Sequence, residues 1–383
     1  MDSSNNHSDP LPATGAVPTS EGASKLQSPR PVHGAVTPAE LRRLGLSSHQ
    51  VVDFSASISP LGPPQGVWEA IRQVDLAAYP DPACLEMRDA LAHHLGVATE
   101  QILVGNGSTE LIHLLARAYL SPPPEGTGNS IFLLTPTYGE YEGAGRMQNA
   151  QVYRLNAHYA DSFCWDIQAA QEQIAARKPS LVFVCNPNNP TGGYLREPDV
   201  RGLAEAASGA GALLVLDEAY LSFVDHHWDS LSLLKGDHVV LLRSMTKDYA
   251  LTGLRLGYFL ASEEVTARLA SFQPDWSVNG LAQAAGLAAL ADTGYLSRAR
   301  ASVSQSKEYL TQHLEALGFA VMPSSANFLL VQVGNGAVMR QKLIRRGLVV
   351  RDCASFGLPD CIRIGIRSLP DCQRLVRAMA EIS

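Results

Sequence analysis

The sequence of residues 242–258 is LRSMTKDYALTGLRLGY. An apolar run ends in Ser244-Met245-Thr246-Lys247, and a second apolar run follows Arg255. Apolar runs that do not alternate with polar residues are typical of strands buried on both faces. We therefore expect Lys247 to lie at the carboxyl end of a buried strand, which is the edge where open α/β sheets bind their ligands.

The pattern of apolar residues predicts an α/β fold. Seven short apolar segments predict strands: QILVG, IFLLTP, VYRL, LVFVCNP, ALLVLDEA, VVLLRSM and GYFLAS. Segments with helical spacing lie between several of them, so residues 79–265 are expected to form a large domain with a mostly parallel sheet covered by helices. Residues 266–383 predict a smaller α+β domain, and residues 31–78 an N-terminal segment that packs with it. Residues 1–30 are polar and rich in Ser and Pro, and are expected to be a disordered tail.

Composition excludes several classes of function. Among the 383 residues 46% are apolar, the net charge is -7, and no Lys/Arg block suggests nucleic acid or an anionic membrane as a partner. The six cysteines show no metal-ligand spacing, so we expect no metal and a reducing cytoplasm. No apolar run is long enough to span a bilayer, and no signal peptide is expected. A ligand-sensing transcription regulator would need a DNA-binding module that the first thirty residues do not resemble.

Polar residues also follow the other predicted strands. Ser108 and Thr109 open a helix after QILVG, where free N–H groups suit a phosphate, although GSTE is equally an ordinary capping sequence. Asn189 lies shortly after LVFVC. Asp217 directly follows ALLVL, and Tyr220 lies shortly after Asp217. A carboxylate at a buried strand end needs a partner, because burial of an unpaired charge is costly.

This combination of residues matches what a pyridoxal-phosphate site requires. The alternative, an exposed lysine that lies near an aspartate by coincidence, explains the combination less well. The aldehyde of this cofactor forms a Schiff base with a lysine, and its ring nitrogen stays protonated when a carboxylate pairs with it. Its phosphate also needs an anchor, and its ring oxygen needs hydrogen-bonding partners. The residues at the predicted strand ends supply each of these groups.

The motifs NPNNPTG, LDEAY and RSMTKDYALTGLRLGY resemble those of fold-type I pyridoxal-phosphate enzymes of the aminotransferase class, and the resemblance extends from His33 to the C-terminus. It implies a homodimer in which Lys247 carries the Schiff base and Asp217 pairs with the pyridine nitrogen. It also implies roles for other residues around the cofactor: Asn189 and Tyr220 at the ring oxygen, Ser244, Arg255 and the amides of Ser108 and Thr109 at the phosphate, Tyr138 on the ring face, and Tyr79 at the phosphate of the neighbouring subunit's cofactor.

The same resemblance implies two arginines for the substrate. Arg363, in CIRIGIR, is similar to the arginine that binds the amino-acid carboxylate with a bidentate fork. Arg351, in GLVVRDC, resembles the arginine that histidinol-phosphate aminotransferases and their nearest relatives use for a substrate phosphate. The alternative for both residues is an exposed position on a strand. A small phosphorylated amino acid or amino alcohol is the expected substrate.

The segment PVHGAVTPAELRRLGLSSHQVVDFSASISPLGPP resembles the opening of the L-threonine-O-3-phosphate decarboxylases of cobalamin biosynthesis. By this resemblance His33 contacts the substrate phosphate, and Ser57 and Asn189 also face the substrate. Ala35 replaces a usual glycine, and Ser57 and Ser59 stand where asparagine is usual. We expect decarboxylation of L-threonine-O-3-phosphate to (R)-1-amino-2-propanol O-2-phosphate. A histidinol-phosphate aminotransferase or another class I/II aminotransferase is the alternative.

Overall fold

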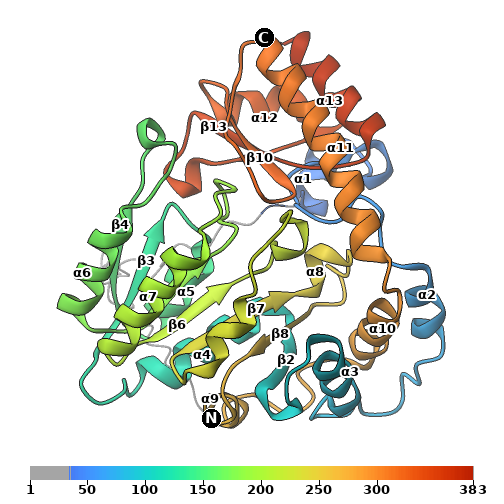
Figure 1. Ribbon diagram of the computed structural model, residues 1–383. Coiled ribbons are helices and arrows are strands. Elements are labelled where there is room, and N and C mark those ends of the chain that lie inside the picture. Colours follow the sequence, from blue (N-terminus) through green and yellow to red (C-terminus); the bar gives the residue numbers. More distant parts are fainter. Residues whose placement is uncertain (1–33, 35, 383) are drawn as a thin grey trace, which may run out of the picture. The chain divides into compact units, whose positions relative to one another are not determined.

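A seven-stranded sheet forms the centre of the computed structural model, which describes Gly34 and residues 36–382 (Figure 1). The predicted tail, His33 and Ala35 lie outside the described residues. The strands follow in spatial order: β2 (Ile102–Asn106), β8 (Leu256–Leu260), β7 (Val239–Ser244), β6 (Leu213–Asp217), β5 (Pro179–Cys185), β3 (Gly128–Thr135) and β4 (Gln151–Asn156). Strand β8 runs antiparallel to β2 and β7, and the other neighbouring strands of this sheet are parallel. The mostly parallel sheet and its seven predicted strands are thus confirmed.

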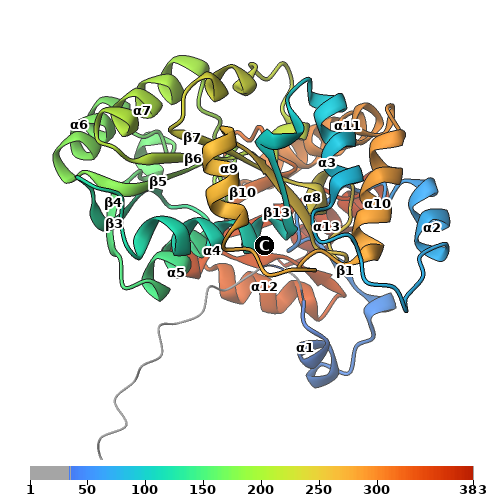
Figure 2. The ribbon, with the colours of Figure 1, turned by 90° about the horizontal axis from the view of Figure 1, so that it is seen from below.

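Helices cover both faces of this sheet (Figure 2). On one face lie α4 (Gly107–Leu120), α5 (Gly139–Met147) and α9 (Glu263–Ala270). On the other face lie α3 (Leu85–Leu95), α6 (Ile167–Arg177), α7 (Glu197–Gly209) and α10 (Gly280–Ala291). Successive residues such as Ile131 and Phe132 are both fully buried, on opposite faces. This burial explains why the strands lack polar alternation.

The C-terminal residues form a second, antiparallel sheet with its own helices. Its strands follow in the order β12 (Arg351–Asp352), β13 (Cys361–Gly365), β10 (Phe328–Gln332) and β9 (Ala320–Val321). The helices are α11 (Tyr295–Ala316), α12 (Gly336–Ile344) and α13 (Leu369–Ala380). Helices α10 and α11 follow one another along the chain, with a break at residues 292–294.

The N-terminal segment lies against this second sheet region. Strand β1 (Val52–Asp53) pairs in parallel with β11 (Leu348–Val349), and Arg367 donates hydrogen bonds to the carbonyl oxygen of Asp53. One apolar core cluster includes residues from both sheets. The domain boundaries at residues 79 and 266 stay a prediction.

The remaining elements are short. They are α1 (Pro38–Arg43), η1 (Ser48–Gln50), α2 (Gln65–Arg72), η2 (Thr99–Gln101), η3 (Tyr159–Asp161), η4 (Leu221–Phe223), η5 (Ser230–Lys235), α8 (Met245–Asp248) and η6 (Ala354–Phe356). Among the helices that the structure describes, none combines the length and apolar character needed to cross a bilayer. The described part of the chain also holds no cluster of three side chains suited to a metal ion.

Candidate active site

A cavity of about 560 Å³ opens at the carboxyl ends of the parallel strands, a size typical of small-molecule sites. It gathers side chains from the large sheet, the N-terminal segment and the second sheet. Most of the predicted site residues line it: Ser57, Thr109, Tyr138, Asn189, Tyr220, Lys247, Arg255, Arg351 and Arg363. Asp217, Ser108, Ser244 and Tyr79 do not line this cavity.

Lys247 enters the cavity from α8, the single helical turn that follows β7. The pKa of its amine is lowered to about 8, mainly by burial and also by the positive charges of Arg363 and Arg255. The carboxylate of Asp217 opposes this shift. A larger fraction of Lys247 than of an ordinary lysine is therefore neutral near neutral pH, and the neutral amine is the nucleophilic form.

Asp217 lies beneath the cavity at the end of β6, almost fully buried. Its carboxylate accepts hydrogen bonds from Tyr141 Oη at 2.7 Å and from the backbone N–H of Ala219 at 3.0 Å. Burial raises the pKa of Asp217 to about 6, and the two hydrogen bonds hold that rise in check. A buried carboxylate that is held by two hydrogen bonds is suited, in its anionic form, to pair with a protonated ring nitrogen.

Tyr141 is a site residue that the sequence analysis missed. It is fully buried and stacks on Phe183, with ring centroids 4.8 Å apart. Its position three residues after Tyr138 places both side chains on neighbouring faces of the start of α5, and their rings meet edge to face. In the sequence TPTYGEY, the spacing of these two tyrosines is the feature that could have pointed to Tyr141.

The N-terminus of α4 and Arg255 form a cradle that fits a phosphate. Gly107 has a φ of +75°, and a Cβ there would lie 2.5 Å from Arg255 Nη2. On the other side, a Cβ at Gly257 would lie 2.6 Å from the backbone nitrogen of Ser108. Glycine at both positions thus allows close approach of the Arg255 guanidinium and of strand β8 to the N-terminus of α4, and a guanidinium and a helix N-terminus both favour anions.

Three predicted residues lie elsewhere or are not described. The Ser244 hydroxyl is bonded to that of Thr246 at 2.6 Å, and Ser244 lines a second cavity. Tyr79 is 81% exposed and packs against Trp276, with ring centroids 4.7 Å apart. The predicted contacts of Ser244, Tyr79 and His33 therefore stay predictions.

Arg351 and Arg363 are buried, with 8% and 5% exposure, so neither is an exposed strand arginine. They are directly paired across β12 and β13, and both line the cavity. Burial and the charge of Arg363 lower the pKa of Arg351. Arg363 donates hydrogen bonds to Asn189 Oδ1 and to the carbonyl oxygen of Ser55, and Arg351 donates one to Ser355 Oγ at 2.7 Å.

The structure separates the two serines that replace asparagine. Ser57 Oγ is buried, lines the cavity and has no hydrogen-bond partner among the described residues. Ser59 Oγ instead accepts a hydrogen bond from Tyr295 at 2.8 Å, and the Ser59 N–H donates to the carbonyl oxygen of Lys247. Ser57 is therefore available to a ligand, whereas Ser59 holds the chain that carries Lys247.

Residues 49–379 match the model of the family described as "Aminotransferase class I and II". The chain belongs to this family. Its relatives include the histidinol-phosphate aminotransferase of Symbiobacterium thermophilum, 36% identical over 88% of this chain and 91% of that protein. The threonine-phosphate decarboxylase of Salmonella typhimurium is 33% identical over 88% of this chain and 93% of that protein.

A solved structure is also similar, that of the histidinol-phosphate aminotransferase from Sinorhizobium meliloti in complex with pyridoxal-5'-phosphate. It has a TM-score of 0.80 and 25% sequence identity, and covers 91% of this chain and 95% of that chain. The fold-type I class and the pyridoxal-phosphate cofactor expected from the sequence are thus confirmed. Both activities that the sequence left open occur among the relatives.

Proposed function

We propose that this enzyme decarboxylates L-threonine-O-3-phosphate to (R)-1-amino-2-propanol O-2-phosphate, a step of cobalamin biosynthesis. The observation that carries the proposal is the pair of buried guanidinium groups beside Lys247 in one cavity. A guanidinium group that lines a cavity can bind an anionic group of a ligand. Phosphothreonine bears both a carboxylate and a phosphate, and the guanidinium fork matches either group.

The cavity residues fit pyridoxal phosphate in chemistry and arrangement. When bound, this cofactor supplies an aldehyde that condenses with amines and a pyridinium ring that withdraws electrons from the substrate Cα. Lys247 Nζ would bind the aldehyde carbon, and Asp217 would keep the proton on the ring nitrogen. The cradle of Gly107, Ser108 and Arg255 would hold the phosphate.

Other residues complete the cofactor site in the proposal, among them Ser244, which lies outside this cavity. Tyr138 would cover one face of the ring, Asn189 and Tyr220 would donate hydrogen bonds to the ring oxygen, and Thr109 and Ser244 would add to the phosphate contacts. Asn189 already accepts a hydrogen bond from Arg363, which links the cofactor side of the cavity to the substrate side.

The substrate residues select the bond that breaks. The residues that hold the two ends of the substrate would set its rotation, and this rotation would decide between loss of the carboxylate and loss of the proton. With Arg363 on the carboxylate and Arg351 and His33 on the phosphate, both ends of the substrate are fixed, and Ser57 Oγ adds a hydrogen bond. Carbon dioxide leaves without its bonding electron pair, which stays on Cα, and Lys247 Nζ then supplies the proton that Cα needs.

Histidinol-phosphate aminotransferase is the second candidate. It is favoured by the histidinol-phosphate aminotransferases of Symbiobacterium thermophilum and Moorella thermoacetica, which are 36% and 34% identical to this chain. Histidinol phosphate has no carboxylate, so in that reaction Arg363 would bind only the 2-oxo acid that accepts the amino group.

The reaction test offers the protein each substrate separately. With phosphothreonine and no 2-oxo acid, we expect carbon dioxide and the phosphorylated amino alcohol, both followed by mass spectrometry. Phosphoserine is tried in parallel, because Ser57 shortens a contact that asparagine usually makes, and Lys247→Ala serves as the inactive control. Formation of glutamate from histidinol phosphate and 2-oxoglutarate, with phosphothreonine untouched, would replace the decarboxylase by the aminotransferase.

A homodimer is part of the proposal and is supported by an exposed apolar patch. Leu76 and Tyr79 are each 81% exposed, and Trp276 packs beside Tyr79 with a φ of +57°, a strained value for a bulky residue. A second copy that covers this patch would bring Tyr79 to its neighbour's cofactor phosphate. Light scattering should find a dimer that Trp276→Ala weakens, whereas Met147→Ala, which removes an exposed apolar side chain on α5, should not.

The proposed location is the cytoplasm. All six cysteines are free, which is usual in a reducing compartment. The acidic net charge of -7 also gives no support to nucleic acid or a membrane as a partner.

A further inference from the structure

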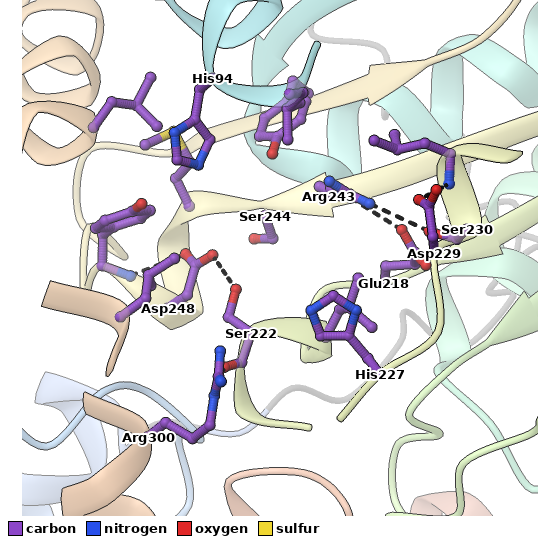
Figure 3. Close-up of a pocket in the computed structure, with 18 of the residues that line it drawn as sticks. His94, Glu218, Ser222, His227, Asp229, Ser230, Arg243, Ser244, Asp248 and Arg300 are labelled. Atoms are coloured by element: carbon purple, nitrogen blue, oxygen red, sulfur yellow. Dashed lines mark hydrogen bonds and ion pairs between the residues drawn. The ribbon is translucent and has the colours of Figure 1, made fainter. Parts of the chain in front are cut away.

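A second cavity of about 300 Å³ lies behind the turn that carries Lys247 (Figure 3). Ser244, Met245 and Asp248 line it, so this cavity borders α8, while Met245 also packs in the apolar core. An isolated helical turn is unstable because its nucleation is unfavourable, and tertiary contacts must hold it. Buried Met245 supplies apolar contacts, and hydrogen bonds at Lys247 and Asp248 anchor α8 further.

Two such anchors flank the helix. At Lys247 the backbone carbonyl accepts a hydrogen bond of 2.8 Å from the N–H of Ser59. At Asp248, Oδ2 accepts a hydrogen bond of 3.0 Å from Ser222 Oγ, while Oδ1 accepts one from the N–H of Tyr249 at 2.9 Å (Figure 3). Burial raises the pKa of the Asp248 carboxyl to about 7, and the Ser222 hydrogen bond opposes that rise.

Ser222 connects this anchor to the other wall of the cofactor cavity. It lies in η4, two residues after Tyr220, and its own carbonyl accepts a hydrogen bond of 3.0 Å from Arg300 Nε on α11. The Asp248–Ser222 bond therefore joins the helix that carries Lys247 to the segment that carries Tyr220. A separate link, the ion pair of Arg243 with Glu218 at 3.0 Å, joins the preceding parts of the same two segments.

We propose that Asp248 is a positioning residue that, through Ser222, fixes Lys247 relative to Tyr220. This inference rests on the proposed role of Lys247 in binding the cofactor, but on neither choice of substrate. Lys247 Nζ has to reach both the cofactor aldehyde and the substrate Cα. A displacement of about 1 Å in such a group lowers the rate on the order of 100-fold, even when ground-state binding hardly changes.

The test compares four holoenzyme variants in buffer more alkaline than the pKa of Asp248: Asp248→Ala, Asp248→Asn, Ser222→Ala and the double variant Asp248→Ala/Ser222→Ala. His94→Ala is the matched control, because His94 lines the same cavity and has no hydrogen bond to α8 among the described contacts. Two quantities are measured. One is kcat and KM with the substrate that the wild type accepts, and the other is the rate at which hydroxylamine removes the yellow colour of the bound cofactor.

We expect Asp248→Ala to lower kcat on the order of tenfold to 100-fold, with KM within about threefold of the wild type. The hydroxylamine reaction should be about tenfold faster, because Lys247 is held less firmly. Asp248→Asn retains an oxygen that accepts from Ser222 and should recover most of kcat. If the two residues act as one unit, the double variant loses no more than the worse single variant.

Wild-type behaviour of Asp248→Ala would overturn the proposal, and so would losses that multiply in the double variant or an Asp248→Asn variant as impaired as Asp248→Ala. Should Asp248→Ala not fold, Ser222→Ala alone decides, since it removes one hydroxyl. A wild-type protein that never becomes coloured with pyridoxal phosphate would refute the cofactor assignment instead. A coloured protein without phosphothreonine turnover would refute only the substrate, and the hydroxylamine rates would still test Asp248.

Discussion

Tyr141→Phe removes a single hydroxyl from beneath the cofactor cavity. In the wild type this hydroxyl donates a 2.7 Å hydrogen bond to Asp217 and opposes the rise that burial causes in the pKa of Asp217, which lies at about 6. A hydrogen bond to a charged group contributes about 1.5–3 kcal/mol. Since one pKa unit corresponds to about 1.4 kcal/mol, its loss should raise the pKa of Asp217 by roughly one to two units.

The sign of the effect follows from the charge that the cofactor needs. The anionic form of Asp217 pairs with the protonated ring nitrogen, so cofactor affinity is present above the pKa of Asp217 and falls as pH drops through it. In the wild type this loss should occur near pH 6. In Tyr141→Phe it should occur roughly one to two units higher, which weakens binding at neutral pH.

The assay is titration of the cofactor-free protein with pyridoxal phosphate from about pH 5 to about pH 9, a range that covers the expected shift. The cofactor's own ionisations are common to both proteins and cancel in the difference between them. Tyr119→Phe is the control, because Tyr119 is also buried but lies on α4 against Arg268, outside the cavity. Affinity curves for Tyr141→Phe that coincide with the wild type at every pH would refute this account of Asp217.

Three further predictions concern other parts of the site. Purified protein should be yellow with bound cofactor, and absorption spectra of Lys247→Ala should lack that colour; a colourless wild type that pyridoxal phosphate cannot reconstitute would contradict the assignment. Gly107→Ala should weaken cofactor affinity at least about tenfold, because it combines a strained φ of +75° with a clash against the Arg255 guanidinium, whereas Gly126→Ala, with a φ of +80° and open space around it, should affect only stability. Arg351→Gln should raise KM for a phosphorylated substrate by about tenfold or more, since it removes a charge-assisted contact. An equal rise in KM for the unphosphorylated analogue would show that Arg351 does not bind the substrate phosphate.

The sequence alone determined the large sheet and the region of the site. Strands such as β5 and β6 are buried on both faces and must be apolar throughout, so their composition identifies them. The polar residue that ends each of these strands lies, by the geometry of a parallel sheet, at one common edge. Lys247, Asp217 and Asn189 could therefore be placed near one another before any contact was known.

Only the tertiary structure decided which side chains meet. Tyr141 and Asp217 are 76 residues apart in sequence, and nothing in either neighbourhood encodes the bond between them. Ser57 and Ser59 occupy equivalent places in the pattern, yet Ser57 faces the cavity with no hydrogen-bond partner in the part of the chain that the structure describes, and Ser59 accepts a hydrogen bond from Tyr295 of a distant helix. Asp248 and Ser222 likewise meet only because η4 and α8 follow neighbouring strands, β6 and β7. Local sequence fixes the burial and direction of a strand, whereas a side-chain hydrogen bond depends on sub-ångström packing of distant segments, which no local pattern contains.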